Sequence, residues 1–132
     1  MQTKNAFKPV GLWYGINNSW VDWCSSEMPE WVTPNRHKLE IDESKILKLS
    51  SISDMMKFNN KYLSKDPALT LFPHIEWHRV KSDGYTGIEI PTYHYQLRFA
   101  DKFLWYYGWD VASGCIFDTR IITKVTKIRK NI

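Results

Sequence analysis

Aromatic side chains are the feature that most constrains how this chain can fold. The sequence has 132 residues, of which seven are Trp, seven are Tyr and six are Phe. Each large ring buries about 150–250 Å² when it is packed, so a small domain has to place many of these rings in its core. A chain of this length has room for one core, and we therefore expect a single domain over residues 1–132.

Short strands interrupted by short helices are predicted along the chain. Apolar or alternating patterns typical of strands cover residues 11–15, 37–42, 46–49, 87–90, 115–117 and 121–128. Helical spacing is found over residues 20–26, over residues 53–63 with Ser53 as the expected N-cap, and over residues 93–102. Pro73 could start a further helix that carries Trp77 and Val80, although Ile75 and Trp77 alternate as in a strand. This order has no regular βαβ rhythm and favours an α+β domain with a mostly antiparallel or mixed sheet.

The net charge of +4 is concentrated near the C-terminus. Residues 119–132 contain five cations and no acid, so the other 118 residues have a net charge of −1. A basic end of this kind is more typical of a solubilising strand end than of a phosphate contact. The aromatic clusters have few cations beside them, whereas platforms for single-stranded nucleic acid usually lie in a basic groove. Nucleic acid is therefore a disfavoured partner, although this pattern does not exclude it.

Cysteine usage and hydropathy indicate the environment of the protein. Cys24 and Cys115 are too few for a disulfide framework, and we expect both to be reduced, buried thiols. We find no apolar run of the kind that forms a signal peptide or a membrane span, so we expect a cytoplasmic protein without a membrane partner. His74 and His78 are four residues apart, but the intervening Glu is not at the zincin position, and we expect no metal site.

Several segments occur in the order and approximate spacing found in ADP-ribosyltransferase-like domains. They are residues 11–15 (GLWYG), the short helix after them, residues 37–47 (HKLEIDESKIL), residues 85–88 (YTGI) and residues 115–118 (CIFD). The corresponding family segments are a GLYFS-like strand, a V-D-x-S-x-I-L strand, a YDGI segment and a terminal strand ending in F-D. The chain resembles this family over most of its length. The resemblance implies a split sheet and a cleft that binds NAD+ or a related nucleotide.

The resemblance also implies which residues contact the cofactor. Trp13 or Tyr14 would stack on the nicotinamide, because a positively charged ring is attracted to an aromatic face. Tyr85, which begins the YDGI-like segment, is assigned to the same cofactor site.

The catalytic pattern of the family is matched only in part. No His precedes residue 11 as the family's ribose-binding His would, and Ser113 stands at the position of the late catalytic Glu. With Ser113 and Asp110 near the ribose, Glu89 or Asp110 would supply the carboxylate that stabilises an oxocarbenium-like centre. The resemblance therefore implies nucleotide binding more directly than it implies transfer.

A non-enzymatic function also fits this composition. A small interaction protein, such as a phage or mobile-element accessory factor, would use exposed Trp and Tyr side chains to bind a protein partner. The burial of the rings distinguishes the two classes of function. We expect Trp20, Trp23 and Trp77 to pack in the core, and we expect Trp13, Tyr14 and the aromatic residues of segment 105–109 to lie in or beside a nucleotide cleft.

Overall fold

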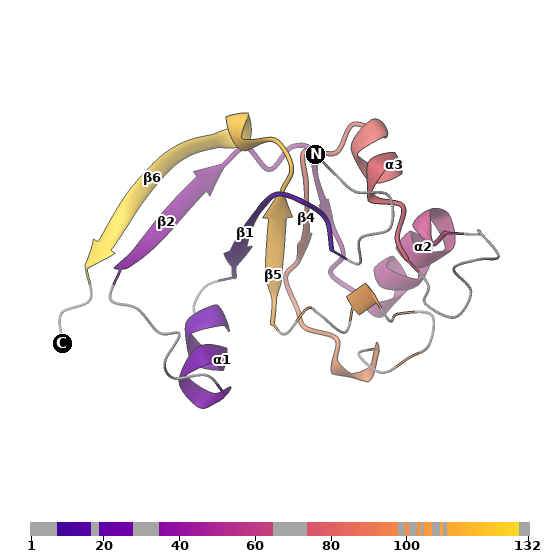
Figure 1. The fold of residues 1–132 in the computed structure, drawn as a ribbon, viewed down its shortest axis with the longest axis horizontal. Helices are drawn as coiled ribbons and strands as arrows, with labels where there is room; N and C mark the ends of the chain where they lie inside the picture. Colours follow the sequence, from indigo (N-terminus) through magenta and orange to yellow (C-terminus); the bar gives the residue numbers. More distant parts are fainter. Residues whose placement is uncertain are drawn as a thin grey trace.

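Two sheets and a few short helices make up the structure (Figure 1). It is a computed structural model that describes residues 8–16, 19–27, 35–64, 74–97, 100, 103, 105–106, 109 and 111–129. Its elements in chain order are β1 (Leu12–Gly15), α1 (Ser19–Glu27), β2 (Asn35–Ile41), β3 (Ile46–Lys48), α2 (Ile52–Tyr62), α3 (Trp77–Ser82), β4 (Gly87–Ile90), the 3₁₀ turn η3 (Tyr95–Leu97), β5 (Ser113–Ile116), the 3₁₀ turn η5 (Thr119–Ile121) and β6 (Ile122–Arg129).

The larger sheet has four strands in the order β1-β5-β4-β3. Strand β5 is antiparallel to both of its neighbours, and β3 runs parallel to β4. Strands β2 and β6 form a separate antiparallel ribbon, which extends to one side of the four-stranded sheet in Figure 1. The predicted α+β class with a mixed sheet is confirmed.

The core lies between the four-stranded sheet and the helices α2 and α3. Rings of Phe58, Trp77 and Trp105 pack within it with centroids 5.6–5.8 Å apart. Trp105 is buried, and its Nε1 donates a hydrogen bond of 2.8 Å to Asn59 Oδ1, which satisfies the polar atom that a buried indole would otherwise leave unpaired. Trp105, Tyr106 and Trp109 are all buried in this core, so the expectation that they lie in or beside a cleft is wrong. Aromatic burial therefore accounts for much of the Trp content.

The helix over residues 53–63 is confirmed as α2, but its predicted N-cap is wrong. The N-cap is Ser51, whose hydroxyl accepts a hydrogen bond from the backbone N–H of Asp54, while the Asp54 carboxylate accepts one from the Ser51 N–H. This reciprocal pair is a capping box with Asp in the usual Glu position. Ser53 lies inside the first turn of the helix instead.

Tertiary pairing also shortens the predicted helix that carries Trp77. Ile75 forms an isolated bridge with Leu63, and helix α3 begins only at Trp77. His74 is therefore buried before the helix, whereas His78 is exposed on it, so the two do not share a helix face.

Two further expectations need correction. Trp20, which is 42% exposed, stacks on the half-buried Trp23, and neither ring belongs to the core as expected, whereas Trp77 does. Within residues 93–97 the structure has only the short turn η3 in place of the predicted helix, and residues 98–99 and 101–102 lie outside the described part of the chain. Cys24 and Cys115 are free and buried, as predicted.

Among the described residues, no helix has the length and apolar character that a membrane span needs.

Candidate functional site

Neighbouring strands bring two of the predicted site residues, Tyr14 and Glu89, into one lateral row. Tyr14 is paired with Gly114 across β1 and β5, and Gly114 is paired with Glu89 across β5 and β4. Lys48 of β3 extends the row as the partner of Glu89. Residues in one row project from the same face of a sheet. The row faces away from the aromatic core, because Cys115, the next residue of β5, belongs to the core cluster.

A hydrogen bond connects the two predicted residues of this row. The Tyr14 hydroxyl donates to Glu89 Oε1 over 2.9 Å, and Lys48 Nζ lies 3.8 Å from Glu89 Oε2. The Tyr14 ring lies over Gly114, where a Cβ would be only 2.7 Å from Tyr14 Cε1. Glycine at this position is therefore what lets the tyrosine reach across β5.

Burial keeps the Tyr14 hydroxyl protonated. Glu89 is 7% exposed, and its two carboxylate oxygens face Tyr14 and Lys48 respectively. Burial, and secondarily the negative charge of Glu89, raise the pKa of Tyr14 far above its usual value, so the hydroxyl remains a donor. The pair can hold a carboxylate in a fixed position within the sheet.

The other predicted site residues lie elsewhere. Trp13 projects to the core face, where it meets Trp109 edge-on with ring centroids 4.7 Å apart. Ser113 is buried and its hydroxyl donates to the Val111 carbonyl over 3.0 Å. Asp110 lies outside the described residues. The structure thus brings Tyr14 to Glu89, but it does not bring Trp13 or Ser113 to that pair.

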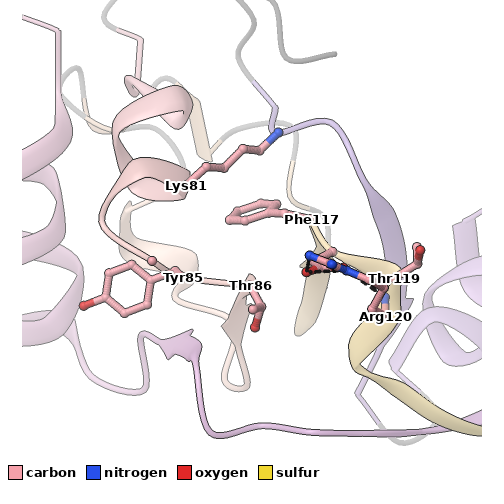
Figure 2. Close-up of a pocket in the computed structure, with 8 residues that line it drawn as sticks. Lys81, Tyr85, Thr86, Phe117, Thr119 and Arg120 are labelled. Carbon is pink, nitrogen blue, oxygen red and sulfur yellow. Dashed lines mark hydrogen bonds and ion pairs between the residues drawn. The ribbon is translucent and has the colours of Figure 1, made fainter.

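Tyr85 lines an open surface pocket of about 650 Å³ that we call the Phe117 pocket. Its lining residues are Lys81, Gly84, Tyr85, Thr86, Phe117, Asp118, Thr119 and Arg120. They come from the end of α3, the loop before β4 and the turn between β5 and β6. Figure 2 shows Lys81 extended above the Phe117 ring, with Tyr85 and Arg120 at opposite ends of the pocket.

Backbone hydrogen bonds hold the two sides of the Phe117 pocket together. The Thr86 carbonyl accepts from the N–H groups of Phe117 and Asp118 over 2.8 and 3.2 Å, and the Thr86 N–H donates to the Lys45 carbonyl over 2.9 Å. The Thr86 Oγ1 atom is buried and has no hydrogen-bond partner among the described residues.

The Phe117 pocket has two cationic groups against one carboxylate. Arg120 donates from Nε and Nη2 to both oxygens of Asp118, and this pairing lowers the pKa of Asp118. Lys81 Nζ lies 5.1 Å from the centroid of the Phe117 ring and 3.5 Å from the Val10 carbonyl oxygen. Burial lowers the pKa of Lys81, because desolvation disfavours the charged amine.

Three lining residues, Lys81, Phe117 and Arg120, were missed as site residues by the sequence analysis. Phe117 lies in the CIFD segment that carries the family resemblance, so that segment contained a usable signal. Lys81 follows no motif, and its place in the pocket depends on how α3 packs against β5. Arg120 was counted only as part of the basic C-terminal segment.

A second hollow, of about 460 Å³, lies beside α1. Its lining includes the carboxylates of Asp22 and Glu27 and the rings of Trp23 and Tyr95. Trp20 stacks on Trp23 with ring centroids 5.4 Å apart. Partly exposed Trp and Tyr rings are enriched in protein-binding hot spots. Binding of a protein partner through an aromatic surface stays a prediction. In the described structure, the exposed rings of Trp20 and Tyr95 lie at or near α1.

A metal site and known relatives are two further sources of evidence about function. In the part of the chain that the structure describes, no three His, Cys, Asp or Glu side chains gather as a metal site would require. No protein-family model, no curated protein and no solved structure matches this chain.

Proposed function

We propose that this protein binds a phosphorylated nucleotide, NAD+ or a related dinucleotide fragment, in the Phe117 pocket. The observation that carries the proposal is the joint presence of two aromatic rings and two cations in one hollow of about 650 Å³. Pockets for small ligands and cofactors have volumes of roughly 300–1,000 Å³ and combine apolar walls with a few polar groups.

Each chemical part of a nucleotide has a complementary group in this pocket. An aromatic base can stack on Phe117 or Tyr85, because offset ring contacts are favourable. The Lys81 ammonium and the Arg120 guanidinium can donate charge-assisted hydrogen bonds to phosphate oxygens. The hydroxyl of Thr119, an exposed residue of the lining, can bond to a ribose or phosphate oxygen.

The family resemblance supports the NAD+ class of ligand in particular. Its YTGI and CIFD segments are far apart in sequence, yet they meet at the Phe117 pocket through the hydrogen bonds of Thr86. The proposed activity is binding, not transfer of ADP-ribose. Among the described lining residues the carboxylate is Asp118, which is engaged by Arg120, and Glu89 projects from the face of the sheet turned away from the core.

Calorimetric titration of the full chain with NAD+ and with ADP-ribose tests this proposal. A hydrogen bond to a charged group contributes roughly 1.5 kcal/mol or more, so Lys81→Gln is expected to weaken binding about tenfold. The matched control is Lys57→Gln, which removes the same charge from an exposed position on α2 that does not line the pocket. The control should bind as the wild type does.

Two results would contradict the proposal. One is the absence of measurable heat with either ligand at about millimolar concentration, which is the weak end of specific affinity. The other is an equal loss of affinity in Lys81→Gln and Lys57→Gln, because that would indicate non-specific charge attraction. Thermal melting of each variant checks that the fold is retained.

A further inference from the structure

The β2–β6 ribbon contains the whole net charge of the protein. Its two strands include five Lys and Arg residues and one acid, Glu40, which gives a net charge of +4. The complete chain has 18 basic and 14 acidic residues and the same net charge of +4. The rest of the chain is therefore balanced, and the ribbon is its one strongly basic element. We propose that this ribbon is an arm that binds the groove of a nucleic-acid duplex.

Exposed side chains along the ribbon are suited to phosphate contacts. Lys38, Lys124 and Lys127 are exposed, and so is Thr126, whose hydroxyl can donate to a phosphate oxygen. Among the ribbon residues whose burial the structure describes, Val125 is the large hydrophobic residue that is exposed. A surface of this composition is complementary to a polyanion and offers little apolar area to a bilayer or to a protein hot spot.

Strand register distributes the cations over both faces of the ribbon. Lys38 is paired with Thr126, and His37 is paired with Lys127. Because neighbouring residues of a strand project to opposite faces, Lys38 and Lys127 lie on opposite faces. Glu40 is paired with Lys124 at the end of the ribbon that joins η5, so the cations left unbalanced are those of the outer end.

This arrangement fits a duplex groove, which has a phosphate backbone on each side. The major groove of DNA is wide enough to admit a two-stranded β-ribbon. At about 3.3 Å per residue, the seven residues of β2 span roughly 23 Å, which matches about seven base pairs at 3.4 Å each. The ribbon also extends away from the four-stranded sheet in Figure 1, so the bulk of the described structure does not lie across its length. The sequence of residues 119–132 alone favours a solubilising strand end over a phosphate contact, but the pairing of β6 with β2 adds Lys38 to the same basic element. The ribbon does not use the aromatic clusters on which single-strand stacking would depend.

Fluorescence anisotropy with a labelled DNA duplex of about 20 base pairs tests the inference over about 50–200 mM salt. We expect the logarithm of the association constant to fall linearly with the logarithm of the salt concentration. The double variant Lys124→Gln/Lys127→Gln should reduce the magnitude of that slope by about 2, since each phosphate neutralised contributes about 0.9. It should also weaken binding at low salt by about tenfold or more. The matched control, Lys45→Gln/Lys57→Gln, removes two exposed cations outside the ribbon and should keep the wild-type slope.

Four outcomes would overturn the inference. They are no duplex binding at low salt, an equal loss in the two double variants, tighter binding to the single strand than to the duplex, and binding to vesicles of phosphatidylserine and phosphatidylcholine in place of the duplex. If Lys124→Gln/Lys127→Gln does not melt cooperatively, the single variant Lys38→Gln on the other strand is used, with Lys57→Gln as its control. A slope reduced by about 1 in Lys38→Gln alone would then support the inference, and an unchanged slope would overturn it.

Discussion

The hydrogen bond from Tyr14 to Glu89 joins two strands that are not neighbours in the sheet. Tyr14 is in β1 and Glu89 is in β4, and the bond crosses β5 above Gly114. A buried carboxylate needs such a donor, because an ionised group without partners in a protein interior is strongly disfavoured. Tyr14 and Glu89 therefore connect β1 to β4, and Gly114 leaves the space on β5 that their hydrogen bond needs.

Removal of the Tyr14 hydroxyl should be costly for stability. We predict that Tyr14→Phe lowers the free energy of unfolding by roughly 1.5–3 kcal/mol, because Glu89 loses a charge-assisted hydrogen bond. Urea denaturation measures this change. The control is Tyr95→Phe at a ring that is 69% exposed, which should stay within about 0.5 kcal/mol of the wild type. Equal stability of Tyr14→Phe and the wild type would show that the bond contributes nothing.

Buried ionisable groups should make the protein sensitive to alkaline pH. Burial raises the pKa of the Cys115 thiol to about 12, and it raises the pKa of Tyr106 and of Tyr14 as well. The native state therefore keeps these protons at a pH where the unfolded chain releases them. Stability is full below the unfolded pKa and falls as pH rises above it.

Cys115 should dominate the first part of this loss. Its unfolded pKa is 9.0, so we predict that the free energy of unfolding falls with a slope approaching about 1.4 kcal/mol per pH unit above pH 9 for this group. Urea midpoints measured between about pH 8 and pH 10 give the slope. In Cys115→Ala the baseline stability is lower but the slope over this range should be shallower. An identical slope in the variant would assign the alkaline loss to other groups.

The first turn of helix α2 is capped by one side chain, that of Ser51. Ser51 and Ser53 both have a side chain suited to capping, and the spacing of Met55, Phe58 and Tyr62 is compatible with either start. The structure selects Ser51 because β3 continues its pairing as far as the Leu49 N–H, which donates to the Glu89 carbonyl, and the chain then turns. Sheet pairing, which local sequence does not reveal, fixed the first turn.

The two serines provide a matched test of this cap. Ser51→Ala should destabilise the protein by about 1 kcal/mol, because the backbone N–H of Asp54 loses the hydroxyl that accepts its hydrogen bond. Ser53→Ala should leave stability unchanged or slightly raised, since alanine is favoured inside a helix. Thermal or urea denaturation of both variants gives the comparison. A larger loss in Ser53→Ala would contradict the observed cap.

Strands and helices could be predicted from the sequence where the residue pattern is local. The alternation of residues 37–42 and the helical spacing in residues 53–63 both correspond to observed elements. Features that depend on distant partners could not be predicted in this way. Ile75 alternates with Trp77 as a strand would, yet its bridge to Leu63 and the helix after it follow from packing.

The site was predictable to a smaller degree than the elements. The resemblance implies separate roles for Tyr14 and Glu89 and gives no sign of their contact, which spans 75 residues of sequence and needs glycine on the strand between them. Trp13 and Tyr14 are alternatives for stacking on the nicotinamide in the resemblance, although adjacent residues of a strand project to opposite faces. The Phe117 pocket depends on the end of α3 meeting the end of β5, which no local spacing reports.

At the scale of the whole molecule, the aromatic core, the Tyr14–Glu89 pair, the Phe117 pocket and the basic ribbon occupy different parts of the fold. The core face of the sheet packs the aromatic rings, and Trp13 of one aromatic group meets Trp109 of the other there by direct contact. The opposite face holds the Tyr14–Glu89 pair. The proposed ligand contacts are at one end of the sheet, and the basic charge is on the ribbon. This separation means that each proposed activity can be disrupted without changing the other.

Amide chemical shifts in an NMR titration with NAD+ test the central claim most directly, because they locate the ligand on the chain. We predict the largest and saturable shifts at the N–H groups of Thr86, Phe117 and Thr119, which line or frame the Phe117 pocket. The N–H groups of Tyr14 and Gly114, in the row on the other face of the sheet, should stay where they are. Shifts centred on Tyr14 and Gly114, or no saturable shift at any of the five, would contradict the claim.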